Sequence, residues 1–182
     1  MISKPRCFLD LLELQRILDE NIEKSRNNGF VPRKRNGLDI LLAIDDEFQE
    51  WLRELPYEYN FKTWKQKEYS REKELEELTD VLFFFLQYFN NCFVDRDKYK
   101  IVIVEVFFER DYYDVDLEYD LCSIIMDFKN DLWNINDLTT FYDYMKIVHK
   151  RGFIREDLLN TYWEKWQKNM TRINKDWILE GK

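Results

Sequence analysis

The chain has 182 residues, with 28 Lys and Arg against 36 Asp and Glu, a formal net charge of −8. Hydrophobic residues make up 45% and aromatic residues 17% of it, which excludes an intrinsically disordered chain and predicts a single domain over residues 1–182. An acidic chain lacks the basic face that neutralises nucleic-acid phosphates, so we expect no nucleic-acid polymer as a partner.

The spacing of apolar residues predicts an all-α protein. Few residues break helices, because the chain has only four glycines and three prolines. Ser70 and the acids after it are typical of a helix start, and the segment 82–86 is apolar on every face, which predicts a central buried helix. The predicted helices cover residues 6–28, 38–55, 70–91, 101–108, 117–132, 136–149 and 155–176.

Two stretches are predicted as loops, and one helix prediction is ambiguous. Residues 29–37 begin and end with glycine and are rich in Arg and Lys, while residues 57–69 are aromatic and basic without a clear period. The β-branched residues of 101–108 suit a strand, but no partner strand is evident, so we predict a helix there.

Cysteine content and hydropathy predict a soluble cytoplasmic protein. The three cysteines are odd in number and have no paired spacing, which favours a reducing compartment. The longest apolar run, residues 81–86, is too short to span a membrane. The shortage of Gly and Pro, together with a single alanine at position 43, indicates a low-GC genome of a bacterium or phage.

Two acidic pairs, Glu47 with Glu50 and Glu77 with Asp80, lie on the predicted helices 38–55 and 70–91. A spacing of three places each pair on one helical face, so antiparallel packing would bring four carboxylates together. Oxygen-only ligands of this kind suit Mg²⁺, or Mn²⁺, as a cofactor.

By spacing alone, a solvated charged face is the more common explanation of such pairs. The apolar residues around these pairs favour the metal site, because a buried charge needs a partner.

Other catalytic classes are excluded by the residues that they require. A ferritin-like di-iron centre uses Glu-x-x-His pairs, but the only histidine is His149, and Lys146 stands three residues before it. The chain also has no glycine-rich phosphate loop.

Two further groups of residues are candidates for substrate binding. Lys165, Asn169 and Arg172 share one face of the last predicted helix and could hold phosphate oxygens, although cations near a helix C-terminus also complement its dipole. Gln15 lies in the apolar face of the first helix, where its amide could recognise a base edge or could simply lie at the core boundary.

Taken in order, these motifs resemble the all-α nucleoside-triphosphate pyrophosphatases and, within them, the dimeric dUTPases. The segments that carry the resemblance are Leu14-Gln15-x-x-Leu18-Asp19, Glu47-x-x-Glu50, Phe61-Lys62-x-Trp64-Lys65, Glu77-x-x-Asp80 and Tyr162-x-x-Lys165-x-x-x-Asn169-x-x-Arg172.

The resemblance implies an Mg²⁺-dependent homodimer that hydrolyses dUTP, and dUDP as well, to dUMP. It implies that the four acids hold the metal, with Glu50 as the base, and that residues 92–158 form a variable, mobile lobe. The substrate-binding residues that it implies are Gln15, Asp19, Trp64, Lys65, Lys165, Asn169 and Arg172. The alternatives are a related pyrophosphatase acting on another nucleotide such as dCTP, and a non-enzymatic helical interaction protein.

Overall fold

The computed structural model describes residues 2–25, 33–65, 67–94, 97–110 and 120–173. Within these residues the chain forms seven helices and no strand, which confirms the predicted all-α class. The helices in chain order are α1 (Phe8–Ser25), α2 (Gly37–Glu54), α3 (Arg71–Cys92), α4 (Lys98–Phe108), α5 (Leu121–Trp133), α6 (Asp137–Lys150) and α7 (Arg155–Arg172).

Helix α3 is the centre of the fold, as its apolar sequence predicted. It packs against α1, α2 and α7, and its residues Leu82, Phe85 and Phe89 are buried. The helix begins after Ser70, whose side-chain oxygen accepts a hydrogen bond from the backbone N–H of Lys73 at 3.2 Å. Because several helices surround α3, side chains from distant parts of the sequence meet along it.

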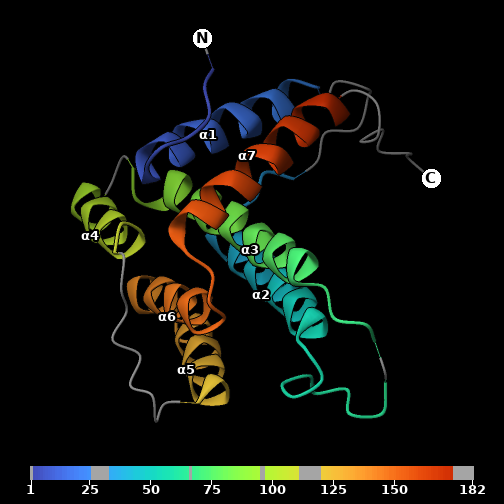
Figure 1. The fold of residues 1–182 in the computed structure, drawn as a ribbon. Helices are drawn as coiled ribbons and strands as arrows, with labels where there is room; N and C mark the ends of the chain where they lie inside the picture. The colour runs from blue at the N-terminus through green and yellow to red at the C-terminus, as the bar shows by residue number, and fades with distance from the viewer. Residues whose placement is uncertain (1, 26–32, 66, 95–96, 111–119, 174–182) are drawn as a thin grey trace.

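The remaining helices form smaller groups around α3. Helices α2 and α3 run antiparallel, joined by the α2–α3 loop at residues 55–70, while α1 and α7 lie side by side across α3 (Figure 1). Helices α5 and α6 pack against each other, and α4 packs against α6 and α1. Helices α1, α2 and α7 therefore bring polar residues to α3, and α6 contacts it as well, because the Tyr144 hydroxyl donates to the Leu78 carbonyl at 2.8 Å.

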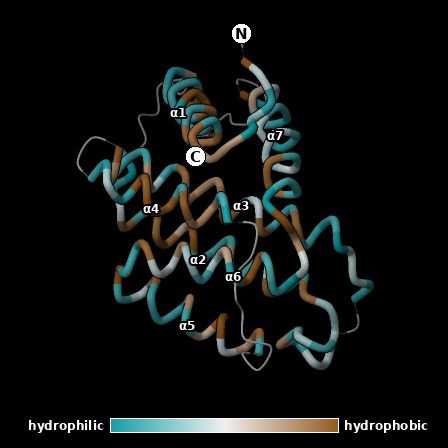
Figure 2. Tube along the Cα trace, turned by 60° about the vertical axis from the view of Figure 1, so that its left-hand side comes forward, coloured by the Kyte–Doolittle hydropathy of each residue, from teal (hydrophilic) through white to brown (hydrophobic). Residues whose placement is uncertain are grey.

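Helix α4 resolves the ambiguous segment 101–108 as a helix that begins at Lys98. Val104 and Phe108 are buried, whereas Val102 and Val106 are exposed, and Figure 2 shows hydrophobic colour along much of this helix. Its apolar residues on several faces explain why sequence periodicity could not assign it.

Several predicted helix boundaries differ by a few residues. The helix expected at 117–132 begins at Leu121, because the Asp120 side chain accepts the backbone N–H of Ser123 at 2.7 Å and caps the helix. Gly37, expected in a loop, is the first residue of α2 because Asn36 caps that helix. The predicted positions 26–32, 117–119 and 174–176 lie outside the described residues.

Candidate functional site

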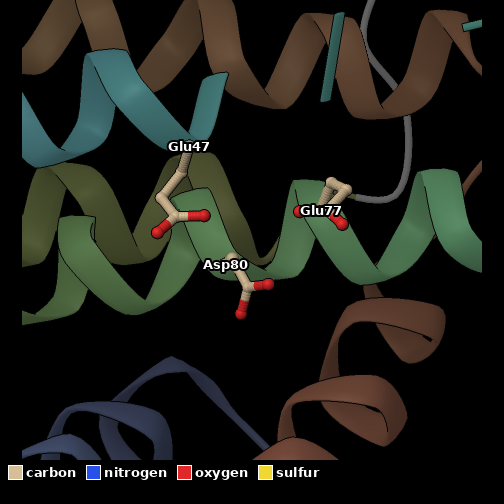
Figure 3. Close-up of side chains that lie close together, drawn as sticks. All are labelled: Glu47, Glu77 and Asp80. Carbon is tan, nitrogen blue, oxygen red and sulfur yellow. The ribbon is translucent and has the colours of Figure 1, made fainter. Parts of the chain in front are cut away.

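Three of the four predicted metal ligands meet between α2 and α3. Glu47 of α2 and Glu77 and Asp80 of α3 each offer a carboxylate oxygen, and these oxygens lie within 4.8 Å of one another. Figure 3 shows Glu47 extending from α2 toward α3, where Glu77 and Asp80 lie on neighbouring turns. We call this group the carboxylate cluster.

Burial and mutual repulsion act on all three carboxyl groups of the cluster. Burial, followed by the charges of Asp80, Glu50 and Glu77, raises the pKa of Glu47 to about 7. Burial is also the largest cause that raises the pKa values of Glu77 and Asp80, which Lys165 partly opposes. The cluster therefore holds more negative charge than its surroundings compensate.

Glu50, the fourth predicted ligand, lies outside the three-oxygen cluster. Its side chain is exposed, but its negative charge still raises the pKa values of Glu47, Glu77 and Asp80. Glu50 therefore lies near the solvent-facing rim of the cluster, where it can contact a substrate or a water molecule.

The cluster fits a hard divalent cation. Its donors are all carboxylate oxygens, and they come from two helices whose backbones hold them close together despite their repulsion. Carboxylates at such separations match the ligands that Mg²⁺ and Mn²⁺ prefer, and a cation between them would compensate the charge.

Lys165 of α7 brings a positive charge to the cluster. Its ammonium group forms an ion pair with Asp80 Oδ2 and donates to the backbone carbonyl of Glu76 at 3.2 Å. The predicted phosphate-binding helix is thus placed beside the acidic pair of α3. Asn169 and Arg172 follow on α7, and both side chains are partly buried.

Gln15 and Asp19 belong to a second polar group, which joins α1, α3 and α7. Gln15 is 3% exposed, and its Nε2 donates to Asp19 Oδ1 at 2.8 Å while its Oε1 accepts from the Tyr162 hydroxyl at 3.0 Å. Gln87 Nε2 donates to the same oxygen of Asp19 at 2.9 Å. We call Gln15, Asp19, Gln87 and Tyr162 the amide network.

The amide network is rigidly packed, yet it keeps hydrogen-bonding capacity for a ligand. The Tyr162 ring stacks on Phe83, with ring centroids 4.1 Å apart. One N–H of the Gln15 amide and a second lone pair on its carbonyl oxygen lie beyond the two bonds just described.

The α2–α3 loop carries the other predicted substrate-binding residues, Trp64 and Lys65. Lys65 helps to line an open pocket of about 250 Å³, whereas Trp64 is 74% exposed and is not among the described residues that line it. We call this the loop pocket; its described lining residues are Glu54, Leu55, Tyr57, Asn60, Lys65, Lys67, Glu68 and Tyr69.

The loop pocket adjoins the carboxylate cluster through Glu54 of α2. Glu54 lines the pocket and forms an ion pair with Lys67 of the loop. Its charge also contributes to the raised pKa of Glu77. The basic residues of the loop therefore lie close to the acidic residues of α2 and α3.

Sequence reasoning missed Gln87 as part of this region. Gln87 follows Asp80 by seven residues, two helical turns, so its place on the same side of α3 was open to prediction. It also missed Glu74 and Arg151, which form a buried ion pair, because nothing in the local sequence of Arg151 indicates its partner.

A helical fold with clustered carboxylates between two antiparallel helices, and a lysine-bearing helix beside them, is the arrangement expected of the all-α nucleotide hydrolases that the motifs resemble. A protein-family model described as dUTPase matches residues 8–177. The chain therefore belongs to the dUTPase family, and the protein is an enzyme, a dUTP diphosphatase. A search of curated proteins found no significant match.

This assignment confirms the resemblance predicted from the motifs. It sets aside the alternative of a non-enzymatic interaction protein.

Among the described residues, no helix is both long and apolar enough to cross a bilayer.

Proposed function

We propose that this protein is an Mg²⁺-dependent enzyme that hydrolyses dUTP, and dUDP as well, to dUMP, and so keeps uracil out of DNA. The observation that carries the proposal is the carboxylate cluster, because three like-charged groups are held within 4.8 Å of one another in a chain that belongs to the dUTPase family. Family membership supports the substrate, and the all-oxygen donor set supports Mg²⁺, with Mn²⁺ as a substitute.

Glu47, Glu77 and Asp80 would hold the metal, with Glu50 completing the set from the rim. A divalent cation bound there would neutralise negative charge on the phosphate oxygens in the transition state. Glu50 is the exposed carboxylate of the four, so we assign it to orient the attacking water and to accept its proton.

The cationic and amide side chains of α7 would bind the phosphate groups. Lys165 already lies beside the cluster through Asp80, and Asn169 and Arg172 extend the same helix face. Lys65 and Trp64 would approach the nucleotide from the α2–α3 loop, on the side of the loop pocket.

The amide network would recognise the base. Asp19 and Tyr162 orient the amide of Gln15 by hydrogen bonds at 2.8 Å and 3.0 Å. An amide fixed in this way presents its remaining donor and acceptor in one orientation, as recognition of a uracil edge requires.

The test is to incubate the purified protein with each deoxynucleoside triphosphate, with dUDP, and with Mg²⁺ or EDTA. We expect dUMP and pyrophosphate from dUTP, dUMP and phosphate from dUDP, and no product in EDTA. Survival of dUTP while dCTP is cleaved would show that the base assignment is wrong. Activity that persists in EDTA after metal removal would overturn the role of the cluster.

The quaternary and cellular assignments belong to the same proposal. We infer a cytoplasmic homodimer in which residues 1–182 form one domain and residues 92–158 a variable lobe. The apolar side chains of Leu38, Leu42, Trp133 and Ile135 are exposed near one another, which supports association with another chain. Light scattering during size-exclusion chromatography measures the molar mass directly, and a mass of one chain would contradict the dimer.

A further inference from the structure

Glu74, in the first turn of α3, is fully buried and receives hydrogen bonds from three other segments. Arg151 after α6 donates from Nε to Oε1 at 2.6 Å and from Nη2 to Oε2 at 3.0 Å. Trp51 Nε1 of α2 donates to Oε1 at 3.3 Å, and the Tyr69 hydroxyl of the α2–α3 loop donates to Oε2 at 2.7 Å. We call Glu74, Arg151, Trp51 and Tyr69 the Glu74 hub.

The hub holds the α2–α3 loop at two separated points. Tyr69, near the end of the loop, bonds to Glu74, and the guanidinium of Arg151 lies 5.2 Å from the ring centroid of Tyr59 earlier in the loop. The loop carries Trp64 and Lys65 between these two points. Tyr57, Tyr59, Phe61 and Trp64 are exposed large side chains, so the body of the loop contributes little apolar burial to fix its own position.

The other half of the hub is rigidly fixed to α3. Arg71, one turn before Glu74, donates to the carbonyl oxygens of Arg151 at 3.2 Å and of Gly152 at 2.7 Å. Its guanidinium also lies 4.2 Å from the ring centroid of Phe153. Gly152 has a φ of 74°, a left-handed conformation that favours glycine. The turn that carries Arg151 is therefore held in place independently of Glu74.

The position of the hub relates it to the active site rather than to stability alone. Glu74 precedes Glu77 of the carboxylate cluster by three residues, and Tyr69 lines the loop pocket that contains Lys65. A buried ion pair contributes little net stability compared with apolar side chains of the same size, because both charges lose their hydration. Complete hydrogen bonding of a buried carboxylate by three segments does fix the relative positions of those segments.

We propose that Glu74 and Arg151 are positioning residues that hold the α2–α3 loop, with Trp64 and Lys65, against the carboxylate cluster in the productive geometry for the nucleotide. The proposal rests on the proposed function for its substrate, but not for the loop contacts themselves. Loss of the hub leaves the metal ligands in place and loosens the loop, although its Lys67–Glu54 ion pair remains. The expected kinetic signature is therefore a raised KM with kcat nearly unchanged.

Tyr69→Phe and Arg151→Lys test this without leaving a buried charge unpaired. The first removes only the hydroxyl that ties the loop to Glu74, and the second replaces the two-pronged contact by a single ammonium. Each is expected to raise the KM for dUTP by about tenfold, the size of one hydrogen bond to a charged group, with kcat within about twofold. The double variant is expected to change KM by less than the product of the single effects, because both act through Glu74.

Two control variants make the same chemical changes elsewhere. Tyr99→Phe removes the hydroxyl of an exposed tyrosine on α4, and Arg155→Lys alters an arginine that pairs with Glu109 away from the loop. Neither is expected to change KM. Unchanged KM in both hub variants, or an equal rise in the Arg155→Lys control, would overturn the proposal.

Amide hydrogen exchange of the full chain separates this proposal from the proposed function. We expect faster exchange of amides in residues 55–70 of both hub variants, with protection of the core of α3 retained. If the native protein hydrolyses no dUTP, the proposed function fails, and exchange alone decides the positioning role. Unchanged exchange in the loop would then overturn it.

Discussion

The amide network and the carboxylate cluster both include residues of the central helix α3, but the polar groups within them interact in opposite ways. In the amide network, Asp19 accepts from both Gln15 and Gln87, and the Tyr162 hydroxyl donates to the Gln15 carbonyl, so these hydrogen bonds fix the Gln15 amide in one orientation. In the cluster, three carboxylates repel one another and Lys165 offsets only part of the charge. The first group is organised before any ligand arrives, whereas the second is completed by a cation.

The largest expected effect comes from neutralising one member of the cluster. Glu47→Gln should lower kcat/KM for dUTP by more than about a hundredfold, because losing only a hydrogen-bond partner of a metal ligand commonly costs about 10- to 100-fold, and Glu47 is proposed as a ligand itself. The metal-free protein should become more stable by about 2 kcal/mol near pH 8, since a repelled, partly buried charge is removed. Steady-state kinetics and thermal melting in EDTA measure the two effects.

Glu23→Gln, which neutralises an exposed acid on α1, is the matched control and should change neither quantity. A Glu47→Gln protein that loses both activity and metal-free stability would show that Glu47 is stabilised by its neighbours rather than repelled by them.

The second prediction concerns the pH dependence of metal binding. The pKa of Glu47 is raised from 4.5 to about 7 in the folded protein. Between these two pH values the folded state therefore keeps a proton on Glu47 that the unfolded chain has lost. The contribution of this group to stability is therefore present below pH 4.5 and is lost as the pH rises through about 7. Because the cation must displace that proton, Mg²⁺ affinity should fall about tenfold per pH unit below 7.

Titration calorimetry at pH 6 and at pH 8 measures this dependence. In the Glu47→Gln variant, Mg²⁺ affinity should depend less steeply on pH, although this variant binds Mg²⁺ more weakly than the native protein at both pH values. Equal Mg²⁺ affinity of the native protein at pH 6 and pH 8 would contradict the raised pKa of Glu47.

A smaller effect is expected from the amide network, because its geometry rests on several hydrogen bonds, of which a single substitution removes only one. Tyr162→Phe removes the hydroxyl that holds the Gln15 carbonyl, which should raise the KM for dUTP by about fivefold and lower stability by about 1 kcal/mol. Tyr88→Phe is the matched control, since the Tyr88 hydroxyl donates to Asp137 at 2.7 Å outside the network. Its stability should fall by a similar amount with no change in KM, and a parallel rise in KM would mean that the Tyr162 effect is not local.

The smallest effect on activity is expected from a contact that belongs to neither the amide network nor the carboxylate cluster. Asn36 accepts the backbone N–H of Asp39 at 3.0 Å and completes the capping box of α2. Asn36→Ala should lower the free energy of unfolding by about 1 kcal/mol and leave the kinetics at 25 °C unchanged. Chemical denaturation measures the first quantity, and a kinetic change without a stability change would contradict a purely capping role.

Local signals predicted most of the fold. Capping residues, apolar periodicity and the scarcity of glycine and proline act within a few residues of each helix, so helices such as α2 and α3 were predicted to within one or two residues at each end. The start of α5 was misplaced because Asp120 was not identified as its cap. The cap resembles other acidic residues of that stretch, and only the contact with Ser123 distinguishes it.

The site was predicted less completely than the helices, because the way the helices pack decides which of their side chains come together. Spacing placed Glu47 and Glu50 on one face of α2, but the rotation of α2 against α3 decides that Glu47 is partly buried and Glu50 exposed. The contact between Glu74 and Arg151 joins residues 77 positions apart, and no local pattern marks it. Interactions of that range require the three-dimensional structure.

The continuous backbone of α3 limits which sequence changes, substitutions or insertions, this helix can accept. Asp80 of the carboxylate cluster and Gln87 of the amide network are seven residues apart on one helix, an axial separation of about 10 Å. A substitution between them alters one side chain, whereas inserting a single residue would turn one end by about 100° relative to the other. Most side chains of the stretch between these two residues are buried, so it should accept apolar substitutions of similar size more readily than changes of length. A one-residue insertion there should uncouple base recognition from metal binding.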